Sequence, residues 1–318
     1  MTFKANIAGA FALAMTVAAS AFAQEFPERP VNLVVPFNAG GGTDLLARGF
    51  APHLAEALDG DVFVSNMAGG SGTVAAGALA GQKPTGYQLG YWSVTVSTIQ
   101  PQIKDVPYGI DSWEPICSVA ASPTMLFTNA GNGIETIEQA KAAIEAEPGK
   151  YLFGSSGPGA MTHLTAVAAF EGLGVLDKIK HLPFQGSGPA LQAMAAGTIQ
   201  FFGDTEILMQ RGDFTPLVIF ADERSANFPD VPTATEVGIG APLNELYLWG
   251  GLFAPAGTPD DVVAKLSDAC GTAVASEGFQ SFAADTQTVL NYRDAAEFDA
   301  FFRAQYEGNT AIIEAAGL

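Results

Sequence analysis

Residues 31–44 read VNLVVPFNAGGGTD and join a β-rich run directly to a glycine-rich turn and the start of a helix. The run from Val31 to Pro36 has the composition of a strand, and the three glycines after it allow a tight turn. Beyond Thr43 and Asp44, apolar residues recur at helical spacing. Because Pro52 lies inside this pattern, we expect it to kink the helix or to shorten its first part. The helical apolar positions are Leu46, Phe50, Leu54 and Leu58.

The same order of strand, glycine-rich turn and helix recurs three more times. The turns occupy residues 66–73, 154–160 and 185–189. A capping box formed by Thr136 and Gln139 predicts another helix start. Further strands are expected over residues 61–65, 88–94, 125–129, 151–153, 180–184, 217–220 and 247–253, and closing helices over 260–274 and 294–316.

Alternating strands and helices of this kind are typical of right-handed parallel α/β units. One set of units precedes residue 122 and another follows it. We therefore expect an α/β protein with two lobes and a mainly parallel sheet in each. Lobe one is expected over residues 24–122 and 246–318, and lobe two over residues 123–245, with strands that cross between them.

The N-terminal residues predict a secretory signal. Lys4 precedes an apolar run from Ile7 to Val17, which is too short to span a bilayer. Ala21-Phe22-Ala23 places small residues at both positions that direct cleavage, so we expect a signal peptide over residues 1–23, cleavage after Ala23 and a periplasmic product. The short apolar run disfavours the alternative of an uncleaved anchor.

Composition excludes several classes of function. A net charge of −19 argues against nucleic acids and anionic membranes as partners, because both are bound through basic patches. No later segment is apolar and long enough for stable membrane insertion. Three histidines without paired spacing offer no metal site, and no cofactor is expected. Export permits a disulfide between Cys117 and Cys270, but we interpret them as two separate buried thiols.

The four glycine-rich turns predict an anion-binding site. A helix N-terminus presents unpaired N–H groups and about half a positive charge, so it can hold an anion without a basic side chain. Such turns meet at the carboxyl ends of strands, where α/β proteins bind ligands. Ordinary βα connections are the alternative for any single turn. Nearby hydroxyls support binding, namely Ser71, Thr73, Ser155, Ser156 and Ser187.

Enzyme motifs are weak in this sequence. Residues 70–75 match the loose dinucleotide pattern, but no acidic residue follows near positions 90–95 to hold a ribose. Ser156 lacks the spacing of a nucleophile elbow. His163 lies close to Ser155 and Ser156 in sequence and is a candidate general base, but a histidine in the first turn of a packed helix more often has a structural role.

Four further side chains have two open interpretations each. Asp204 follows an aromatic strand and either bonds a ligand or caps the helix that starts at Glu206. Phe37, Trp92 and Trp249 either line a pocket or pack in the core, as aromatic residues usually do.

Taken together, the motifs resemble the substrate-binding proteins of tripartite tricarboxylate transporters, also called the Bug family. The first turn resembles P-F-x-x-G-G-x-x-D, and the others resemble further family segments in the same order along nearly the whole chain after residue 23. The matching segments are residues 36–44, 66–70, 151–157 with 162–164, 181–190, 228–233 and 251–259.

This resemblance implies a flytrap-like receptor that closes on an organic carboxylate and presents it to the subunits of a membrane permease. It implies a non-enzymatic monomer that binds a mono-, di- or tricarboxylate in the cleft between its lobes. An exported enzyme and a sensory receptor for a membrane kinase are the alternatives. Carried over by position, with Trp92 and Thr162 included, the expected ligand-binding residues are Phe37, Asn38, Ala39, Gly41, Gly42, Thr43, Asp44, Ala68, Gly69, Gly70, Trp92, Ser155, Ser156, Thr162, Gly186, Ser187 and Asp204.

This sequence departs from the family pattern near the expected pocket. Asn38, the pair Met67-Ala68 and Gln185 replace the usual residues, and Tyr91-Trp92-Ser93 is bulkier than expected after the third strand. The resemblance therefore implies a class of ligand and no particular acid.

Overall fold

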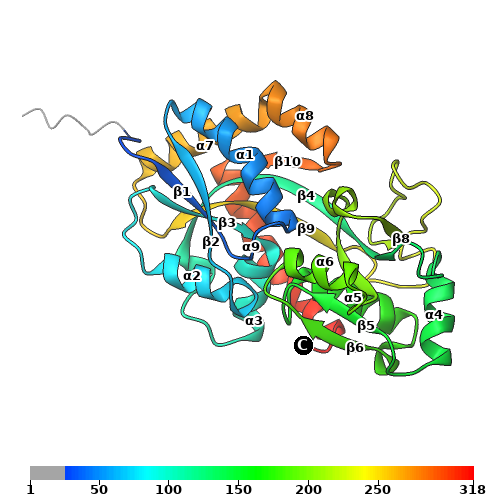
Figure 1. The fold of residues 1–318 in the computed structure, drawn as a ribbon. Helices are drawn as coiled ribbons and strands as arrows, with labels where there is room; N and C mark the ends of the chain where they lie inside the picture. The colour runs from blue at the N-terminus through cyan, green and yellow to red at the C-terminus, as the bar shows by residue number, and fades with distance from the viewer. Residues whose placement is uncertain (1–25) are drawn as a thin grey trace, which may run out of the picture.

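A computed structural model describes residues 26–318 (Figure 1). The predicted signal peptide and its cleavage site lie outside the described residues. The strands are β1 (Val31–Val35), β2 (Val62–Asn66), β3 (Gln88–Ser93), β4 (Trp113–Asn129), β5 (Leu152–Ser155), β6 (Lys180–Pro183), β7 (Phe201–Thr205), β8 (Phe214–Ile219), β9 (Tyr247–Pro255) and β10 (Leu290–Arg293). The α-helices are α1 (Gly42–Leu58), α2 (Thr73–Ala80), α3 (Gln100–Ile103), α4 (Ile137–Ala146), α5 (Met161–Gly172), α6 (Ser187–Ala195), α7 (Asp260–Ala275), α8 (Glu277–Asp285) and α9 (Ala295–Ala315).

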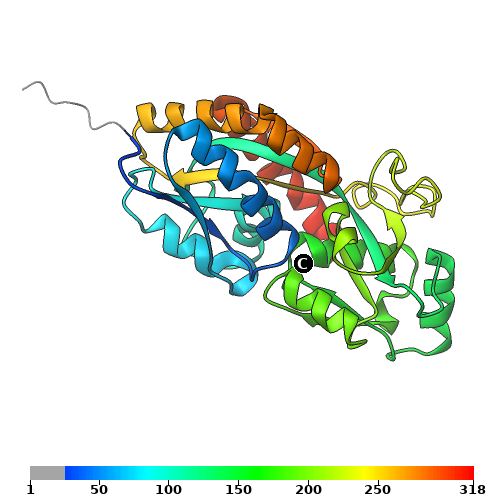
Figure 2. The ribbon, with the colours of Figure 1, turned by 45° about the horizontal axis from the view of Figure 1, so that its top comes forward.

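The strands form two lobes joined by one long strand, β4 (Figures 1 and 2). In lobe one, β1 pairs in parallel with β2 and β3, and β9 runs antiparallel between β3 and β4. In lobe two, β5 pairs in parallel with β6 and β7, while β7 and β8 run antiparallel to β4. Each lobe therefore has parallel strands, and antiparallel strands make the connection between the lobes.

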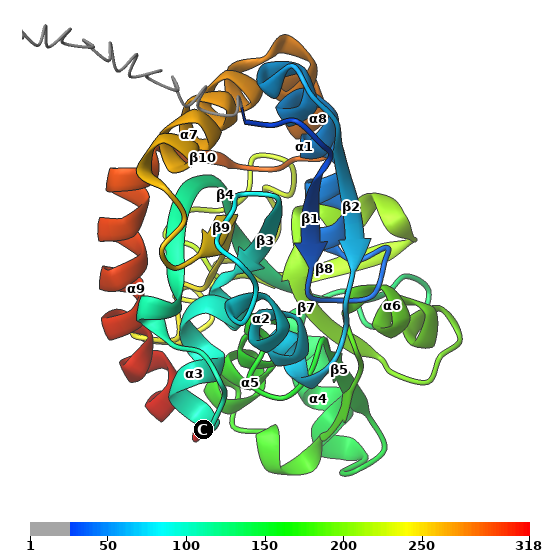
Figure 3. The same cartoon turned by 90° about the vertical axis from the view of Figure 1, so that its left-hand side faces the viewer.

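Helices cover both faces of the lobe-one sheet because successive strand residues point to opposite faces (Figure 3). Leu33 of β1 is buried with residues of α1, α7 and α8. Its neighbour Val34 is buried on the other face, in a core that includes residues of α2 and α9. Burial on both faces explains why β1 reads as a continuous apolar run.

Two local predictions can be compared directly with the structure. Thr136 accepts a hydrogen bond from the Gln139 N–H (3.3 Å), and Gln139 reaches back to the Thr136 N–H, which confirms the capping box. Pro52 does not shorten α1, which is a single helix from Gly42 to Leu58. We attribute its tolerance to the burial of Phe50 and Leu54 on either side, which outweighs the lost backbone hydrogen bond.

The interpretation of two separate thiols is wrong, because Cys117 of β4 and Cys270 of α7 form a disulfide. Their Cα atoms lie 6.5 Å apart although 153 residues separate them in sequence. Packing of α7 against β4 brings them together. No local sequence pattern reports such a long-range contact.

Within residues 26–318, every helix is too short or too polar to cross a lipid bilayer.

Candidate ligand-binding site

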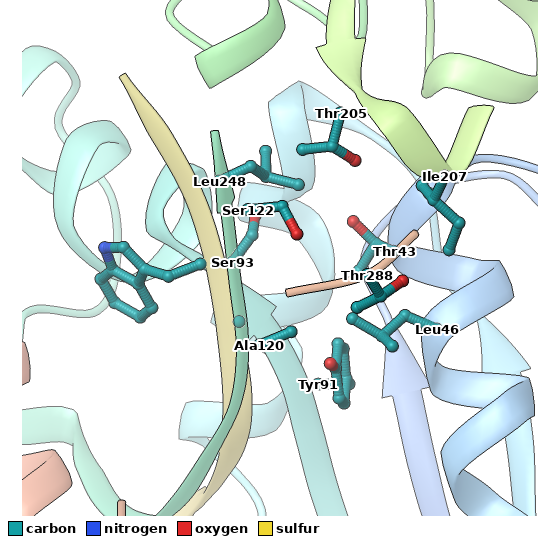
Figure 4. A pocket seen from close by; sticks show the side chains of 13 residues that line it. Thr43, Leu46, Tyr91, Ser93, Ala120, Ser122, Thr205, Ile207, Leu248 and Thr288 are labelled. Atoms are coloured by element: carbon teal, nitrogen blue, oxygen red, sulfur yellow. The ribbon is translucent and has the colours of Figure 1, made fainter. Parts of the chain in front are cut away.

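Two small adjoining cavities lie where the two lobes meet. The first, which we call the loop cavity, is lined by Phe37, Gly41, Gly42, Thr43, Asp44, Ser93, Thr95, Ser156, Thr162, Ser187, Asp204 and Leu248. The second, the strand cavity, is lined by Gly42, Thr43, Leu46, Tyr91, Ser93, Ala120, Ser122, Thr205, Ile207, Leu248, Trp249, Gly250 and Thr288 (Figure 4). They share Gly42, Thr43, Ser93 and Leu248, so they adjoin each other.

Both cavities are too small for an organic acid in this conformation. The volume open to the centre of a water molecule is about 10 Å³ in the loop cavity and about 20 Å³ in the strand cavity. Each is room for about one water. An organic acid would fit here only if the walls of this region moved apart.

Hydrogen bonds between the lobes hold this closed arrangement. The Asn38 N–H donates to the Gln185 carbonyl (3.0 Å). The Ser71 hydroxyl and the Gln100 amide both donate to the Pro158 carbonyl (2.9 and 3.1 Å). The bonds from Asn38 and Ser71 join predicted turns of one lobe to those of the other, and the bond from Gln100 comes from α3, so opening would break all three.

Two helices begin at the loop cavity with no capping side chain. The N-cap residues are Gly41 for α1 and Gly186 for α6, and neither has a side chain that can accept a hydrogen bond. A Cβ atom added to Gly41 would lie 3.3 Å from the backbone nitrogens of both Ser187 and Gly188, so the start of α6 abuts the start of α1. Because N–H groups at helix starts lack intrahelical partners, the two helices converge on a region that favours an anion.

The start of α5 is completed from the opposite lobe. Thr95, which follows β3 in lobe one, accepts a hydrogen bond from the Met161 N–H through its hydroxyl oxygen (2.9 Å). This bond exists only when the lobes are together, so opening would leave an N–H group of α5 unpaired.

Asp44 organises the first glycine-rich turn. Its carboxylate accepts hydrogen bonds from the Gly40 N–H (2.9 Å), Arg48 Nε (3.0 Å) and Asn66 Nδ2 (2.8 Å). Burial alone would raise the pKa of Asp44, but these hydrogen bonds outweigh burial and lower the pKa. Since its oxygens are occupied, Asp44 is a positioning residue for the turn.

The predicted hydroxyls of lobe two are held by partners within the protein. Ser156 and Thr162 share a hydrogen bond between their hydroxyls (2.6 Å), and the Ser187 hydroxyl donates to Asp204 Oδ2 (2.6 Å). Ser155 is fully buried and lies 2.6 Å from His181 Nε2. These contacts fix the turns, and they place Ser156, Thr162 and Ser187 at the loop cavity.

His163 and His181 pack behind the third turn and contact protein groups there. His163 Nδ1 accepts a hydrogen bond from the Gly159 N–H (3.2 Å), and its ring stacks on His181 with centroids 4.2 Å apart. Burial lowers the pKa of each to about 4, with the nearby His181 adding to the effect at His163. Both rings are therefore neutral at pH 7. Ser155, the hydroxyl that contacts a histidine, is sealed from solvent, so no substrate reaches that pair.

Asp204 is a buried carboxyl group in the loop cavity. It lies on β7, and the 3₁₀ helix Glu206–Arg211 has Thr205 as its N-cap residue, so Asp204 does not cap that helix. Burial raises the pKa of Asp204 to about 6, although hydrogen bonds from Ser187 and Thr205 oppose the effect. The group is thus largely ionised at pH 7 but protonates within a mild acid range.

A bound carboxylate should raise the pKa of Asp204 further, because a like charge disfavours the ionised form. Binding would then take up a proton. We expect the affinity to be constant below about pH 6 and to fall by up to about tenfold per pH unit above it, until Asp204 is ionised in the complex as well. Isothermal titration calorimetry between pH 5.5 and 8, in buffers of different ionisation enthalpy, measures both effects.

Asp204→Asn should bind equally well across this pH range. The neighbouring titratable groups do not interfere, because Asp44 has a lowered pKa and His163 and His181 titrate near pH 4. A pH dependence that persists in Asp204→Asn would assign the effect to another group.

Several predicted residues lie outside the enclosed cavities. Ala39 is exposed and lines an open groove with Gly40 and Arg211. Ala68, Gly69 and Gly70 line neither cavity: the first two are half-buried and Gly70 is exposed, and their turn reaches lobe two through Ser71. Gly186 and Asn38 sit at the contact between the lobes: a Cβ atom at Gly186 would lie 3.1 Å from the Asn38 nitrogen.

The expectation that Trp92 lines the pocket needs correction. Trp92 is buried on the opposite face of β3, where its ring packs edge-on against Trp113. Its neighbours Tyr91 and Ser93 face the cavities instead. The residue chosen from sequence was one position away from the correct face, which reverses the direction of the side chain.

Sequence reasoning also missed residues from segments it had not connected to the site. Strand alternation could have identified Tyr91 and Ser93 once β3 was recognised as leading to the site. Thr288 precedes β10 and Leu248 lies on β9, so only the fold reveals their contribution. Trp249, for which a place in the pocket was one of two interpretations, is among the residues that line the strand cavity. The other lining residues that were not predicted are Leu46, Thr95, Ala120, Ser122, Thr205, Ile207 and Gly250.

Two α/β lobes that enclose a site made from glycine-rich helix starts define the class of two-lobed periplasmic solute-binding proteins. Comparison with known proteins gives the family. The model of the tripartite tricarboxylate transporter family receptor matches residues 46–318, and the chain belongs to this family. The family consists of transporter receptors, so the chain is a binding protein, and the enzyme interpretations are set aside.

Individual relatives agree with this assignment. A UPF0065 protein of Bordetella pertussis is 33% identical over 84% of this chain and 83% of its own length. The periplasmic binding protein BugD is 26% identical, with a TM-score of 0.83 over 92% of this chain and 99% of its own. MatC from Rhodopseudomonas palustris, solved with bound malate, is 27% identical, with a TM-score of 0.83 over 91% of this chain and 100% of its own.

Proposed function

We propose that this protein captures a small organic carboxylate in the periplasm and delivers it to the membrane subunits of a tripartite tricarboxylate-type transporter. The observation that carries the proposal is the convergence of α1 and α6 on the loop cavity, both without a capping side chain. Among the residues described, no lysine, arginine or histidine lines that cavity. Backbone N–H groups would therefore bind the anion in a protein whose net charge is −19.

The family supports the choice of ligand and of membrane partner. MatC is a relative with malate bound, and the family name describes receptors of tripartite transporters. The secretory signal expected over residues 1–23 would bring the protein to the compartment where such receptors act.

Closure of the two lobes is the second part of the proposal. We assign residues 24–122 and 246–318 to one lobe and 123–245 to the other. The pairing of β4 supports this division: up to Pro123 it pairs with β9, and from Thr124 it pairs with β7. The ligand-binding residues proposed from sequence then act from both sides, with Gly41, Gly42 and Thr43 from lobe one and Ser156, Thr162, Ser187 and Asp204 from lobe two.

A thermal-unfolding screen of the purified protein tests the carboxylate. Mono-, di- and tricarboxylates are added one at a time, and the methyl ester of each acid serves as its control. A ligand at 100 times its Kd should stabilise the protein by about 2.7 kcal/mol, because it binds only the folded state. We expect at least one acid to raise the unfolding midpoint and its ester to have no effect. A panel without any such acid would contradict the proposal.

A further inference from the structure

Two hydroxyl groups of β3 face the strand cavity without a hydrogen-bond partner. Tyr91 and Ser93 are 1% and 2% exposed, and neither the Tyr91 hydroxyl nor the Ser93 hydroxyl has a partner in the described structure. Buried polar groups are nearly always paired, because an unpaired one loses its bonds to water and gains nothing. Two unpaired hydroxyls on one face of one strand, both lining the same cavity, therefore indicate that something else binds there.

The local structure makes room for the Tyr91 side chain and keeps it neutral. Gly250 lies opposite Ser93 on the paired strand β9, and a Cβ atom there would come within 3.4 Å of the Tyr91 ring. Burial raises the pKa of Tyr91, so its phenol stays protonated and can donate a hydrogen bond. Figure 4 shows its ring beside Leu46 and Thr288.

The remaining walls of the strand cavity are apolar or weakly polar. Leu46, Ala120, Ile207 and Leu248 supply aliphatic surface, and Tyr91 is the one titratable residue among those that line the cavity. The start of α6 lies at the loop cavity only, and the start of α1 borders both cavities through Gly42 and Thr43. A second carboxylate in the strand cavity would have no basic side chain to pair with and would share the start of α1 with the first carboxylate, which makes its desolvation unfavourable.

We propose that the strand cavity is a second subsite that binds a neutral oxygen of the ligand, a hydroxyl or a carbonyl, through Tyr91 and Ser93. This inference rests on the proposed function, which places the ligand carboxylate in the loop cavity. The shared residues Gly42, Thr43, Ser93 and Leu248 put the two compartments next to each other, so a ligand that extends past these residues would occupy both. The ligand class is a hydroxy or oxo monocarboxylate with a short aliphatic body.

Both lobes contribute to this subsite, which links it to closure. Thr205 and Ile207 come from lobe two, whereas Tyr91, Ser93 and Leu46 come from lobe one. Occupation of the strand cavity would therefore favour the closed arrangement through contacts with both sides.

Calorimetric titrations with matched acids test the subsite. Each set contains three straight-chain acids of four to six carbons: an unsubstituted monocarboxylate, a monocarboxylate with a hydroxyl or oxo group, and the dicarboxylate. We expect the oxygen-bearing monocarboxylate to bind about tenfold tighter than either of the others, as one or two neutral hydrogen bonds would give. The double variant Tyr91→Phe/Ser93→Ala should lose this preference, so that the oxygen-bearing and the unsubstituted monocarboxylate bind it with affinities within about twofold of each other.

Tyr108→Phe is the control variant. Tyr108 is also buried, but its hydroxyl donates to the Val96 carbonyl (3.0 Å) and does not line the strand cavity. We expect Tyr108→Phe to reduce stability and to keep the ligand preference, whereas Tyr91→Phe should not reduce the stability of the ligand-free protein, since it removes an unpaired hydroxyl.

The outcomes separate the two proposals. If acids bind but the oxygen-bearing acid has no advantage, or its advantage survives in the double variant, the subsite is wrong and the proposed function stands. A dicarboxylate that binds tightest would also overturn the ligand class. If no acid binds the wild-type protein, the proposed function itself fails.

Discussion

Gly41→Leu should reduce carboxylate affinity by at least about a thousandfold, equivalent to about 4 kcal/mol of binding free energy. A Cβ atom at Gly41 would already lie 3.2 Å from the Ser187 Cβ and 3.3 Å from two backbone nitrogens of α6. A leucine side chain would extend from there into the loop cavity, displace the anion and keep the lobes apart. Titration of the best ligand from the carboxylate screen measures the loss.

The fold should survive this substitution. Gly41 has a φ of −88° and a ψ of 170°, an extended conformation that any residue adopts. The cores of the two lobes do not pass through it, so we expect the free energy of unfolding of the ligand-free protein to change by less than about 1 kcal/mol. Gly70 would be a poor choice for the same test, since its φ is +60° and a Cβ atom would lie 2.3 Å from the Thr73 hydroxyl.

Gly308→Leu is the matched control for Gly41→Leu. Gly308 lies exposed on α9, and a Cβ atom there has no neighbour within 4 Å. Its affinity should equal that of the wild type, while Gly41→Ala should fall between the two because the contacts at 3.2–3.3 Å require only a small shift. Unchanged affinity in Gly41→Leu would show that the ligand binds elsewhere.

The fold class could be predicted from sequence because its repeated unit is local. An apolar run, a glycine-rich turn and a helical pattern follow one another within about thirty residues, and the expected positions of β1, β5 and α5 agree with the structure. The long strand β4 was recognised only over residues 125–129, because the preceding segment contains Pro115 and Pro123, which argue against a strand. Its pairing with β9 and β7 depends on distant residues.

The site was predictable where it depends on the chain's own turns. The first and fourth turns do meet, as Gly41 and Ser187 show, although β1 and β6 belong to the sheets of different lobes: the two turns lie opposite each other where the lobes meet. The direction of side chains was harder to predict. The large Trp92 ring suggested a pocket residue, but successive side chains of β3 point to opposite faces of the sheet, and those of Tyr91 and Ser93 line the cavities. That the residues bind a ligand remains a prediction for the experiments above.

Removing the disulfide should destabilise the protein substantially and leave binding intact. A bridge that closes a loop of 153 residues restricts the unfolded chain strongly, and we expect Cys117→Ala/Cys270→Ala to lower the free energy of unfolding by about 3–5 kcal/mol. Neither cysteine lines the loop cavity or the strand cavity, so ligand affinity should stay within about twofold of wild type. Urea unfolding and calorimetric titration measure the two quantities.

The double alanine variant changes two things at once, because it also removes buried sulfur atoms from the core around α7 and β4. Wild-type protein refolded in the presence of a reductant separates them, since it keeps both side chains and lacks only the bond. If the bond itself stabilises, reduced wild type should lose most of the 3–5 kcal/mol that the variant loses. Equal stability of the oxidised and reduced wild type would attribute the loss in the variant to packing alone. A loss of affinity in both the variant and the reduced wild type would instead mean that a shift of α7 against β4 also displaces Ala120 and Ser122. These two residues of β4 line the strand cavity and lie only a few residues beyond Cys117.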